Sequence, residues 1–121
     1  GGRSFGGRMT SQAQAIAPLE GVRGLAFLAF PLHPAGEPSE IRAAHLSDVT
    51  VPMLFLQGTR DALAERALIE AVAARLGTRA TLSFIEQADH SFRVPAGSGR
   101  KDAEVLAEVL RRLAAWIDTL M

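Results

Sequence analysis

The chain has 121 residues, of which 48% are hydrophobic and 21% are charged. This length and composition fit one globular domain at most, with a real apolar core. Thirteen basic residues balance thirteen acidic ones, so the charge gives no case for a nucleic acid or an anionic membrane as a partner. The chain has no cysteine, which excludes disulfides, cysteine metal ligands and a cysteine nucleophile. A cysteine-free chain suits a reducing compartment, and we expect a cytoplasmic protein.

The first seven residues contain the pattern Gly2-x-Ser4-x-Gly6. This pattern is typical of a nucleophile elbow, in which a strand ends in a tight turn and a helix begins at once. The serine then lies at the apex with a strained backbone, and a side chain at either flanking glycine is expected to collide with the neighbouring strand or helix. The alternative is that Ser4 is an ordinary helix N-cap after a glycine turn.

An elbow needs a strand in front of its serine, and here only three residues precede Ser4. We therefore expect a further strand upstream of Gly1. On this interpretation, residues 1–121 form the C-terminal portion of a single longer domain.

Helical and strand patterns alternate along the rest of the chain. Apolar runs bounded by glycine or proline are typical of strands buried on both faces of a parallel sheet. We expect strands over residues 24–30, 51–57 and 80–86. We expect helices over residues 5–17, 39–46, 64–76 and 102–120. This order predicts an α/β fold, with three visible strands in a parallel sheet and helices on both of its faces.

Individual residues also predict how the helices begin, end and pack. Ser39 is a candidate N-cap for the second helix, and Gly77 is expected to end the third. The last helix has a stripe of apolar side chains at helical spacing, which we expect to face the core. The stripe consists of Leu106, Val109, Leu110, Leu113, Ile117 and Leu120.

Three polar side chains follow successive strands of the expected sheet. Ser4 follows the implied first strand, Asp61 follows the second visible strand, and His90 follows the third. Because the carboxyl ends of parallel strands meet at one edge, we expect these side chains to lie together. A neutral imidazole can take the proton of a serine hydroxyl, and a carboxylate on the other ring nitrogen fixes the tautomer. The backbone N–H of Phe5 is the expected oxyanion donor.

Two alternatives concern the acid of this group. Asp61 can instead cap the helix that follows it. Asp89 is a rival acid, but side chains of adjacent residues usually diverge, so we expect Asp89 to bond its own loop and not His90. The histidines and aspartates lack the spacing of a metal-binding motif, and we expect neither a metal nor a cofactor.

Three further residues are candidates for the substrate pocket. His33 lies between prolines in a loop after a strand, where we expect a structural role, and lining of the pocket is the alternative. Arg3 and Arg60 flank the expected catalytic positions and are candidates for binding a substrate carboxylate. The alternative for both arginines is a solvated surface position.

Four motifs in order carry a family resemblance: Gly-Arg-Ser-Phe-Gly-Gly-Arg-Met, Phe-Pro-Leu-His-Pro-Ala-Gly, Gln-Gly-Thr-Arg-Asp and Ala-Asp-His-Ser-Phe. With these motifs the chain resembles the C-terminal half of small α/β-hydrolases related to dienelactone hydrolase. The group includes testis-expressed hydrolase-like proteins and the hydrolase-like subunit of the NSL chromatin complex. The resemblance implies that Ser4 is the nucleophile, Asp61 the acid and His90 the base. Dienelactone hydrolase has a cysteine in place of Ser4, so its substrate does not carry over.

The resemblance implies a serine hydrolase that cleaves an ester, thioester or related acyl bond of a small molecule through an acyl-enzyme. It also implies that the N-terminal strands and the loop with the second oxyanion donor are absent from this chain. The alternative is a hydrolase-like subunit that keeps the fold and the three residues but serves interaction or scaffolding without catalysis.

Overall fold

The structure is a computed structural model that describes residues 1–120. It contains four strands, three α-helices and three short 3-10 helices. In chain order they are β1 (Gly2–Arg3), α1 (Phe5–Ile16), β2 (Leu25–Leu28), η1 (Ile41–Asp48), β3 (Met53–Gly58), α2 (Arg66–Leu76), η2 (Gly77–Arg79), β4 (Ala80–Ile85), η3 (Ala96–Ser98) and α3 (Asp102–Asp118).

The four strands form one parallel sheet in the order β1-β2-β3-β4. Their carboxyl ends are in register, with Arg3 opposite Leu28 and Leu28 opposite Leu56. The predicted α/β class and parallel sheet are therefore confirmed. The strand expected wholly upstream of Gly1 is found within the chain, as the two-residue strand β1 directly before Ser4.

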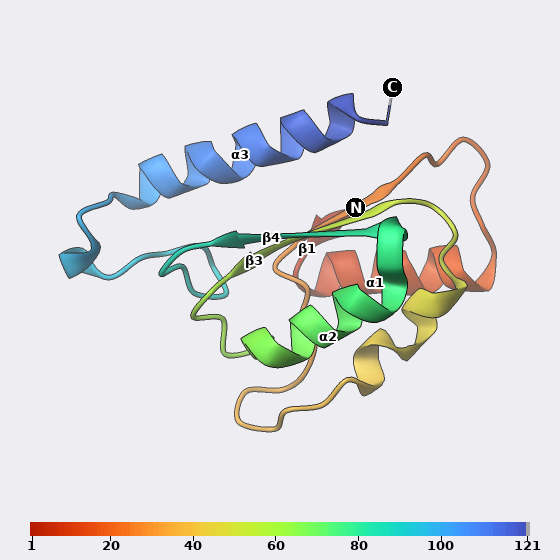
Figure 1. The fold of residues 1–121 in the computed structure, drawn as a ribbon, viewed down its shortest axis with the longest axis horizontal. Coiled ribbons are helices and arrows are strands. Elements are labelled where there is room, and N and C mark those ends of the chain that lie inside the picture. The colour runs from red at the N-terminus through yellow and green to blue at the C-terminus, as the bar shows by residue number, and fades with distance from the viewer. Residues whose placement is uncertain (121) are drawn as a thin grey trace.

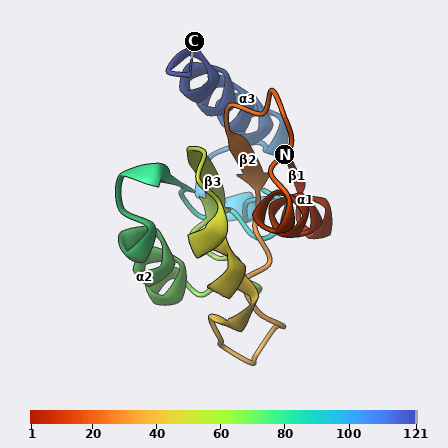
Figure 2. The ribbon, with the colours of Figure 1, turned by 90° about the vertical axis from the view of Figure 1, so that its right-hand side faces the viewer.

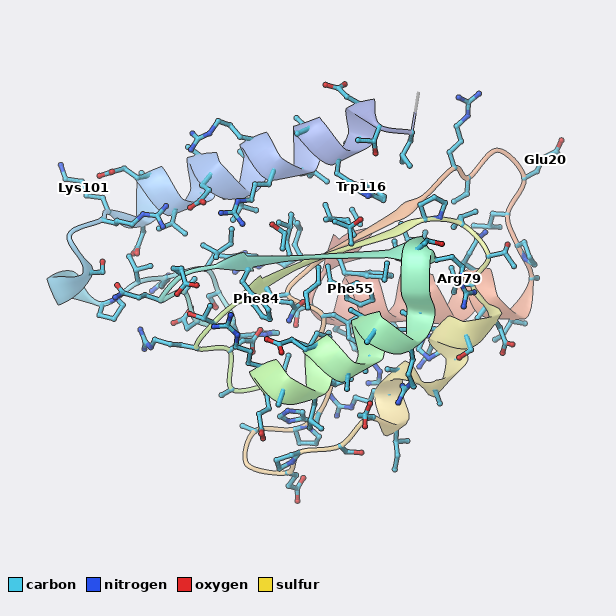
Figure 3. The ribbon with its side chains drawn as sticks, in the orientation of Figure 1. Glu20, Phe55, Arg79, Phe84, Lys101 and Trp116 are labelled. Atoms are coloured by element: carbon cyan, nitrogen blue, oxygen red, sulfur yellow. The ribbon has the colours of Figure 1, made fainter. Side chains whose placement is uncertain are left out.

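The sheet lies between two helical layers. The helices α1, α2 and η1 cover one face, and α3 crosses the other (Figures 1 and 2). Phe55 belongs to the core on the first face, where it packs against the rings of Phe27 and Phe30. Trp116 of α3 packs on the opposite face, and the two side chains lie on opposite sides of the sheet (Figure 3). Both faces of β3 are thus covered, as its continuous apolar sequence predicts.

The helix α3 packs through a narrower stripe than its sequence predicts. Val105 and Val109 are buried, but Leu106 is 54% exposed and Leu110 is 52% exposed. Ile117 is also exposed, so these three members of the expected core stripe do not reach the core. Each residue advances about 100° around a helix, which turns Leu106 and Leu110 away from the core that Val105 and Val109 reach. The side that they form lines a pocket with Arg3 and Leu28 at the edge of the sheet and stays about half exposed.

The second expected helix is a 3-10 helix and not an α-helix. Its turns are closed by i to i+3 bonds, such as the one from the Ala43 N–H to the Glu40 carbonyl (3.0 Å). The N-cap is Glu40 and not the expected Ser39, although the Ser39 hydroxyl accepts the N–H of Ile41 (3.2 Å). Gly77 ends α2 with a φ of 64°, as predicted. No helix in the described part of the chain combines the length and apolarity needed to span a bilayer.

Candidate active site

Ser4 forms a sharp turn between β1 and α1. Its φ is 50° and its ψ is −122°, a strained conformation for a residue with a side chain. Two backbone bonds hold the turn: the Ser4 N–H donates to the Leu28 carbonyl (2.9 Å), and the Arg8 N–H donates to the Ser4 carbonyl (3.1 Å). Ser4 occupies the N-cap position of α1, but its hydroxyl makes no capping bond. The hydroxyl is therefore available for another partner.

Glycines at two positions allow the turn to close, and one of them is not the expected one. A Cβ on Gly2 would lie 2.6 Å from the backbone of Gly6, and a Cβ on Gly7 would lie 2.7 Å from the Gly2 carbonyl oxygen. A Cβ on Gly6 would meet no heavy atom within 4 Å. The expected collision at Gly6 is therefore wrong, because β1 meets α1 at Gly7, on the side of the helix that faces the strand.

The hydroxyl of Ser4 is the start of a chain of hydrogen bonds. Its Oγ lies 2.7 Å from His90 Nε2. On the other side of the ring, His90 Nδ1 lies 2.8 Å from Asp61 Oδ2 and 3.0 Å from Oδ1. A neutral imidazole with its proton on Nδ1 satisfies all these contacts, since it donates to the carboxylate and accepts from the serine. The three side chains expected to lie together are brought together here.

The carboxylate of Asp61 is enclosed by its own turn. Its side chain is fully buried, and Oδ1 also accepts the N–H of Leu63 (2.8 Å). The helix α2 begins at Arg66 with Glu65 as its N-cap. Asp61 is therefore not the N-cap, and both of its carboxylate oxygens lie within hydrogen-bond distance of His90 Nδ1. The buried carboxylate is bonded by the N–H of Leu63 and by the imidazole, so it can accept a hydrogen bond from the Nδ1–H of His90.

The loops after β3 and β4 are joined backbone to backbone. Gly58 lets the Ala88 carbonyl come so close that a Cβ on Gly58 would clash with it. The Arg60 N–H donates to the same carbonyl (2.9 Å), and the Thr59 Oγ1 accepts the N–H of Gln87 (2.8 Å). These bonds tie the segment that carries Asp61 to the segment that carries His90.

The loop after β4 is shaped further by Asp89. Its Oδ1 accepts the N–H groups of Ser91 (2.9 Å) and Arg93 (3.0 Å). The carboxylate therefore bonds its own loop, as its sequence position predicts, and it fixes the turn that presents His90. It does not compete with Asp61 for the imidazole.

Phe5 and the two arginines lie around this group. The Phe5 side chain is exposed, and its N–H occupies the first position of α1, where a helix offers no internal acceptor.

Arg3 is exposed and helps to line a pocket of about 310 Å³ between the sheet edge and α3, together with Phe92 and Leu110. Arg60 is also exposed, and its guanidinium donates to the Gln87 carbonyl (3.1 Å). It does not line the pocket of Arg3, so the two guanidinium groups are not brought to one site.

His33 lies inside the protein and not in a pocket. It is 2% exposed. Nδ1 donates to the Pro34 carbonyl (2.8 Å), and Nε2 accepts the N–H of Glu65 (2.9 Å). Both ring nitrogens are occupied by backbone groups, which agrees with the expected structural role and not with the alternative of lining a substrate pocket.

Sequence reasoning missed Gln57, which organises the loop after β2. This side chain is fully buried, and Oε1 accepts the N–H of Phe30 (2.6 Å), where the preceding Ala29 has a φ of 63°. The signal for it was a glutamine at the end of an otherwise apolar buried strand, because a buried amide requires partners.

A second serine–histidine pair lies deeper along α1. The Oγ of Ser11 is 2.7 Å from His45 Nε2, but Ser11 is fully buried and also donates to the Arg8 carbonyl (2.6 Å). Burial lowers the pKa of His45 below its usual value, with the nearby Arg8 guanidinium as the second cause. This pair joins α1 to η1 and lacks an accessible hydroxyl. Over residues 1–120, no three His, Asp or Glu side chains are grouped in a way that would hold a metal ion.

Known proteins that are similar to this chain share its fold. A family model described as an alpha/beta hydrolase domain matches residues 1–118. An α/β serine hydrolase without a lid from Xanthomonas campestris is 23% identical with a TM-score of 0.61, over 95% of this chain and 45% of that one. An α/β serine hydrolase homologue from Coxiella burnetii is 21% identical with a TM-score of 0.57, over 74% of this chain and 38% of that one.

The chain thus spans less than half the length of these two solved structures. Their likeness, at this identity, shows the fold. The family match extends over nearly the whole chain and includes the elbow and both loops described above. The chain belongs to the α/β-hydrolase domain family.

Proposed function

We propose that this chain carries the catalytic residues of a serine hydrolase, with Ser4 as nucleophile, His90 as base and Asp61 as the acid that orients it. The observation that supports this most is the unbroken chain of hydrogen bonds from a strained elbow serine through His90 to a buried carboxylate. The proposed substrate is a small molecule with an ester, thioester or related acyl bond. The proposed location is the cytoplasm, which the cysteine-free composition suits.

In the first half of the reaction, the Oγ of Ser4 attacks the acyl carbon while its proton passes to Nε2 of His90. The tetrahedral intermediate then collapses. The bond to the leaving group breaks, and His90 returns the proton to the departing alcohol or thiol. Asp61 stays ionised throughout and stabilises the imidazolium that forms between these two transfers.

In the second half, a water molecule attacks the acyl-enzyme. His90 takes one proton from the water and gives it to the Oγ of Ser4 when the acid product leaves. The enzyme returns to its starting protonation state, and the net reaction consumes one water. No cofactor is required for this balance.

The backbone N–H of Phe5 is proposed as one oxyanion donor. It follows the nucleophile directly and lies at the start of α1, where the aligned peptide dipoles favour negative charge. A second donor is proposed to come from a loop upstream of this chain, as in the fold that the family describes.

We also propose that residues 1–121 are the C-terminal portion of a larger hydrolase domain. The chain spans less than half of the two solved structures it matches. The strand β1 has a partner on one side only, and Leu106 and Leu110 of α3 are exposed beside it. An upstream segment that adds strands next to β1 would cover this edge and this apolar surface.

Fluorophosphonate labelling of the complete hydrolase domain tests the proposed function. We expect one label, on Ser4, and none in the Ser4→Ala variant. Ser11→Ala is the matched control, because Ser11 also lies 2.7 Å from a histidine but is buried, so this variant should label like the wild type. A folded wild-type domain that takes no label would exclude the hydrolase and favour a non-catalytic, hydrolase-like subunit.

A further inference from the structure

We propose that His33 is a positioning residue for the catalytic acid Asp61. This inference rests on the proposed function, since it assigns His33 a role in holding the carboxylate against His90. His33 comes from the loop after β2, and Asp61 comes from the loop after β3. His33 is connected to Asp61 through hydrogen bonds to the backbone of Leu63 and Glu65.

Three hydrogen bonds fasten His33 in this place. Its backbone N–H donates to the Leu63 carbonyl (2.9 Å), and its Nε2 accepts the N–H of Glu65 (2.9 Å). Nδ1 donates to the Pro34 carbonyl (2.8 Å). With the proton on Nδ1, Nε2 keeps its lone pair for Glu65. The ring therefore joins the backbone at Pro34 to the backbone at Glu65, and these two bonds on its two nitrogens fix its orientation.

Leu63 connects this attachment to the carboxylate. Its carbonyl receives the His33 N–H, and its own N–H donates to Asp61 Oδ1 (2.8 Å). The same oxygen lies 3.0 Å from His90 Nδ1. A shift of the Leu63 peptide would therefore move or release a carboxylate oxygen that also contacts the imidazole.

His33 also supplies a contact that the start of α2 lacks. Glu65 is the N-cap of this helix, and its own side chain makes no capping bond. In a capping box, a side chain three residues further on accepts the N-cap N–H. Here the imidazole of His33, 32 residues upstream, accepts it instead. The start of α2 and the turn of Asp61 are thereby held by the same residue, the first through the His33 side chain and the second through its backbone N–H.

The test compares His33→Phe with His33→Gln in the complete hydrolase domain. Phe keeps the ring but has no acceptor, whereas the amide oxygen of Gln can take the place of Nε2. With a p-nitrophenyl ester as substrate, we expect His33→Phe to lower kcat about 10- to 100-fold, as for a catalytic group misplaced by about 1 Å. KM should be unchanged, and His33→Gln should recover most of the lost kcat.

A second measurement does not depend on turnover. The His90 Nδ1 proton, held by the carboxylate, should give a downfield proton NMR signal that is shifted or broadened in His33→Phe and restored in His33→Gln. Arg79→Met is the matched control. Arg79 also joins backbone segments, through the carbonyls of Ser47 and Val49. It directly precedes β4, at the end of the sheet opposite to Lys101 and to the carboxyl ends of the strands, which carry the catalytic residues (Figure 3). Its variant should lose stability and leave this signal in place.

A double-variant cycle completes the test. Once Asp61→Asn has removed the carboxylate, adding His33→Phe should lower kcat little further, because the group it positions is already gone. An equal loss in both backgrounds, or an unchanged His90 signal in a folded His33→Phe variant, would overturn the proposal. If the wild type neither turns over ester nor takes the fluorophosphonate, the proposed function fails, and the NMR comparison still decides whether His33 positions Asp61.

Discussion

Ser4 Oγ and His90 Nε2 lie 2.7 Å apart, although the two residues are 86 positions apart and follow opposite edge strands of the sheet. With neighbouring strands about 4.8 Å apart, β1 and β4 are separated by roughly 14 Å. The loop after β4 must therefore pass back over the ends of β3 and β2 to reach Ser4. The contact depends on how that loop is anchored along the way, which makes the anchoring residues as important to the site as the reacting ones.

Removing either reacting group should abolish turnover almost completely. We expect Ser4→Ala and His90→Ala each to lower kcat by about three to six orders of magnitude, with little further loss when they are combined, because the two act as one unit. Steady-state kinetics on an ester substrate in the complete domain measure this. Losses that multiply in the double variant would contradict a shared role.

The glycines of the elbow offer a matched pair of variants. Gly7→Ala places a Cβ 2.7 Å from the Gly2 carbonyl oxygen, and we expect it to destabilise the domain by about 1–3 kcal/mol and to lower activity. Gly6→Ala enters open space within a helix, where alanine is favoured over glycine by roughly 0.5–1 kcal/mol, so it should be neutral or stabilising. Urea unfolding of both variants measures the difference. Equal effects at the two positions would show that the contact between β1 and α1 does not set the elbow.

The sequence was sufficient for the parallel sheet and for the grouping of Ser4, Asp61 and His90. Each of these residues follows a recognisable strand, and parallel strands bring their carboxyl ends to one edge. The position of Asp89 next to His90 likewise predicted that its carboxylate bonds its own loop. These features depend on neighbours in sequence and on strand order, both of which can be read from residue patterns.

Other features depend on contacts between distant segments and could not be read in this way. Which elbow glycine meets β1 follows from how α1 sits on the strand, and it is Gly7 and not Gly6. The loop position of His33 left a structural role and a pocket role open, and only the structure shows that the backbone of Pro34 and Glu65 occupies its ring. Leu106 is exposed because α3 packs on the sheet through Val105 and Val109. An amphipathic pattern cannot tell which of several adjacent apolar residues faces the sheet.

The anchoring of the loop after β4 can be tested at Gly58. An alanine there would bring a Cβ against the Ala88 carbonyl oxygen, and the segment that carries His90 would have to move. We expect Gly58→Ala to cost about 1–3 kcal/mol of stability and to lower kcat at temperatures where the variant is still folded. Gly97→Ala is the control, since a Cβ there meets nothing within 4 Å. If folded Gly58→Ala keeps full kcat, the position of His90 does not depend on this contact.

The pair of the buried Ser11 and the partly buried His45 should make stability depend on pH. Burial, and secondarily Arg8, lowers the pKa of His45 in the folded state, while Asp48 opposes the shift. The unfolded chain then binds the proton more readily, so stability should fall as pH drops below the ordinary histidine pKa of about 6.5 and through the lowered folded value. Urea unfolding between pH 5 and 8 measures this slope. In His45→Gln the slope should be smaller, and an identical slope would assign the pH dependence to other groups.

The exposed apolar side of α3 should govern how the 121-residue chain behaves when it is made alone. Leu106 and Leu110 are about half exposed, and they lie beside the single-partnered strand β1. Both features favour association with other chains. We expect the isolated chain to self-associate in light scattering coupled to gel filtration, and Leu106→Lys with Leu110→Glu to shift it toward the monomer. In the complete domain, the same pair of substitutions should instead destabilise the fold, because the upstream segment is proposed to cover these side chains. A monomeric wild-type chain with a cooperative melt would show that this surface needs no cover.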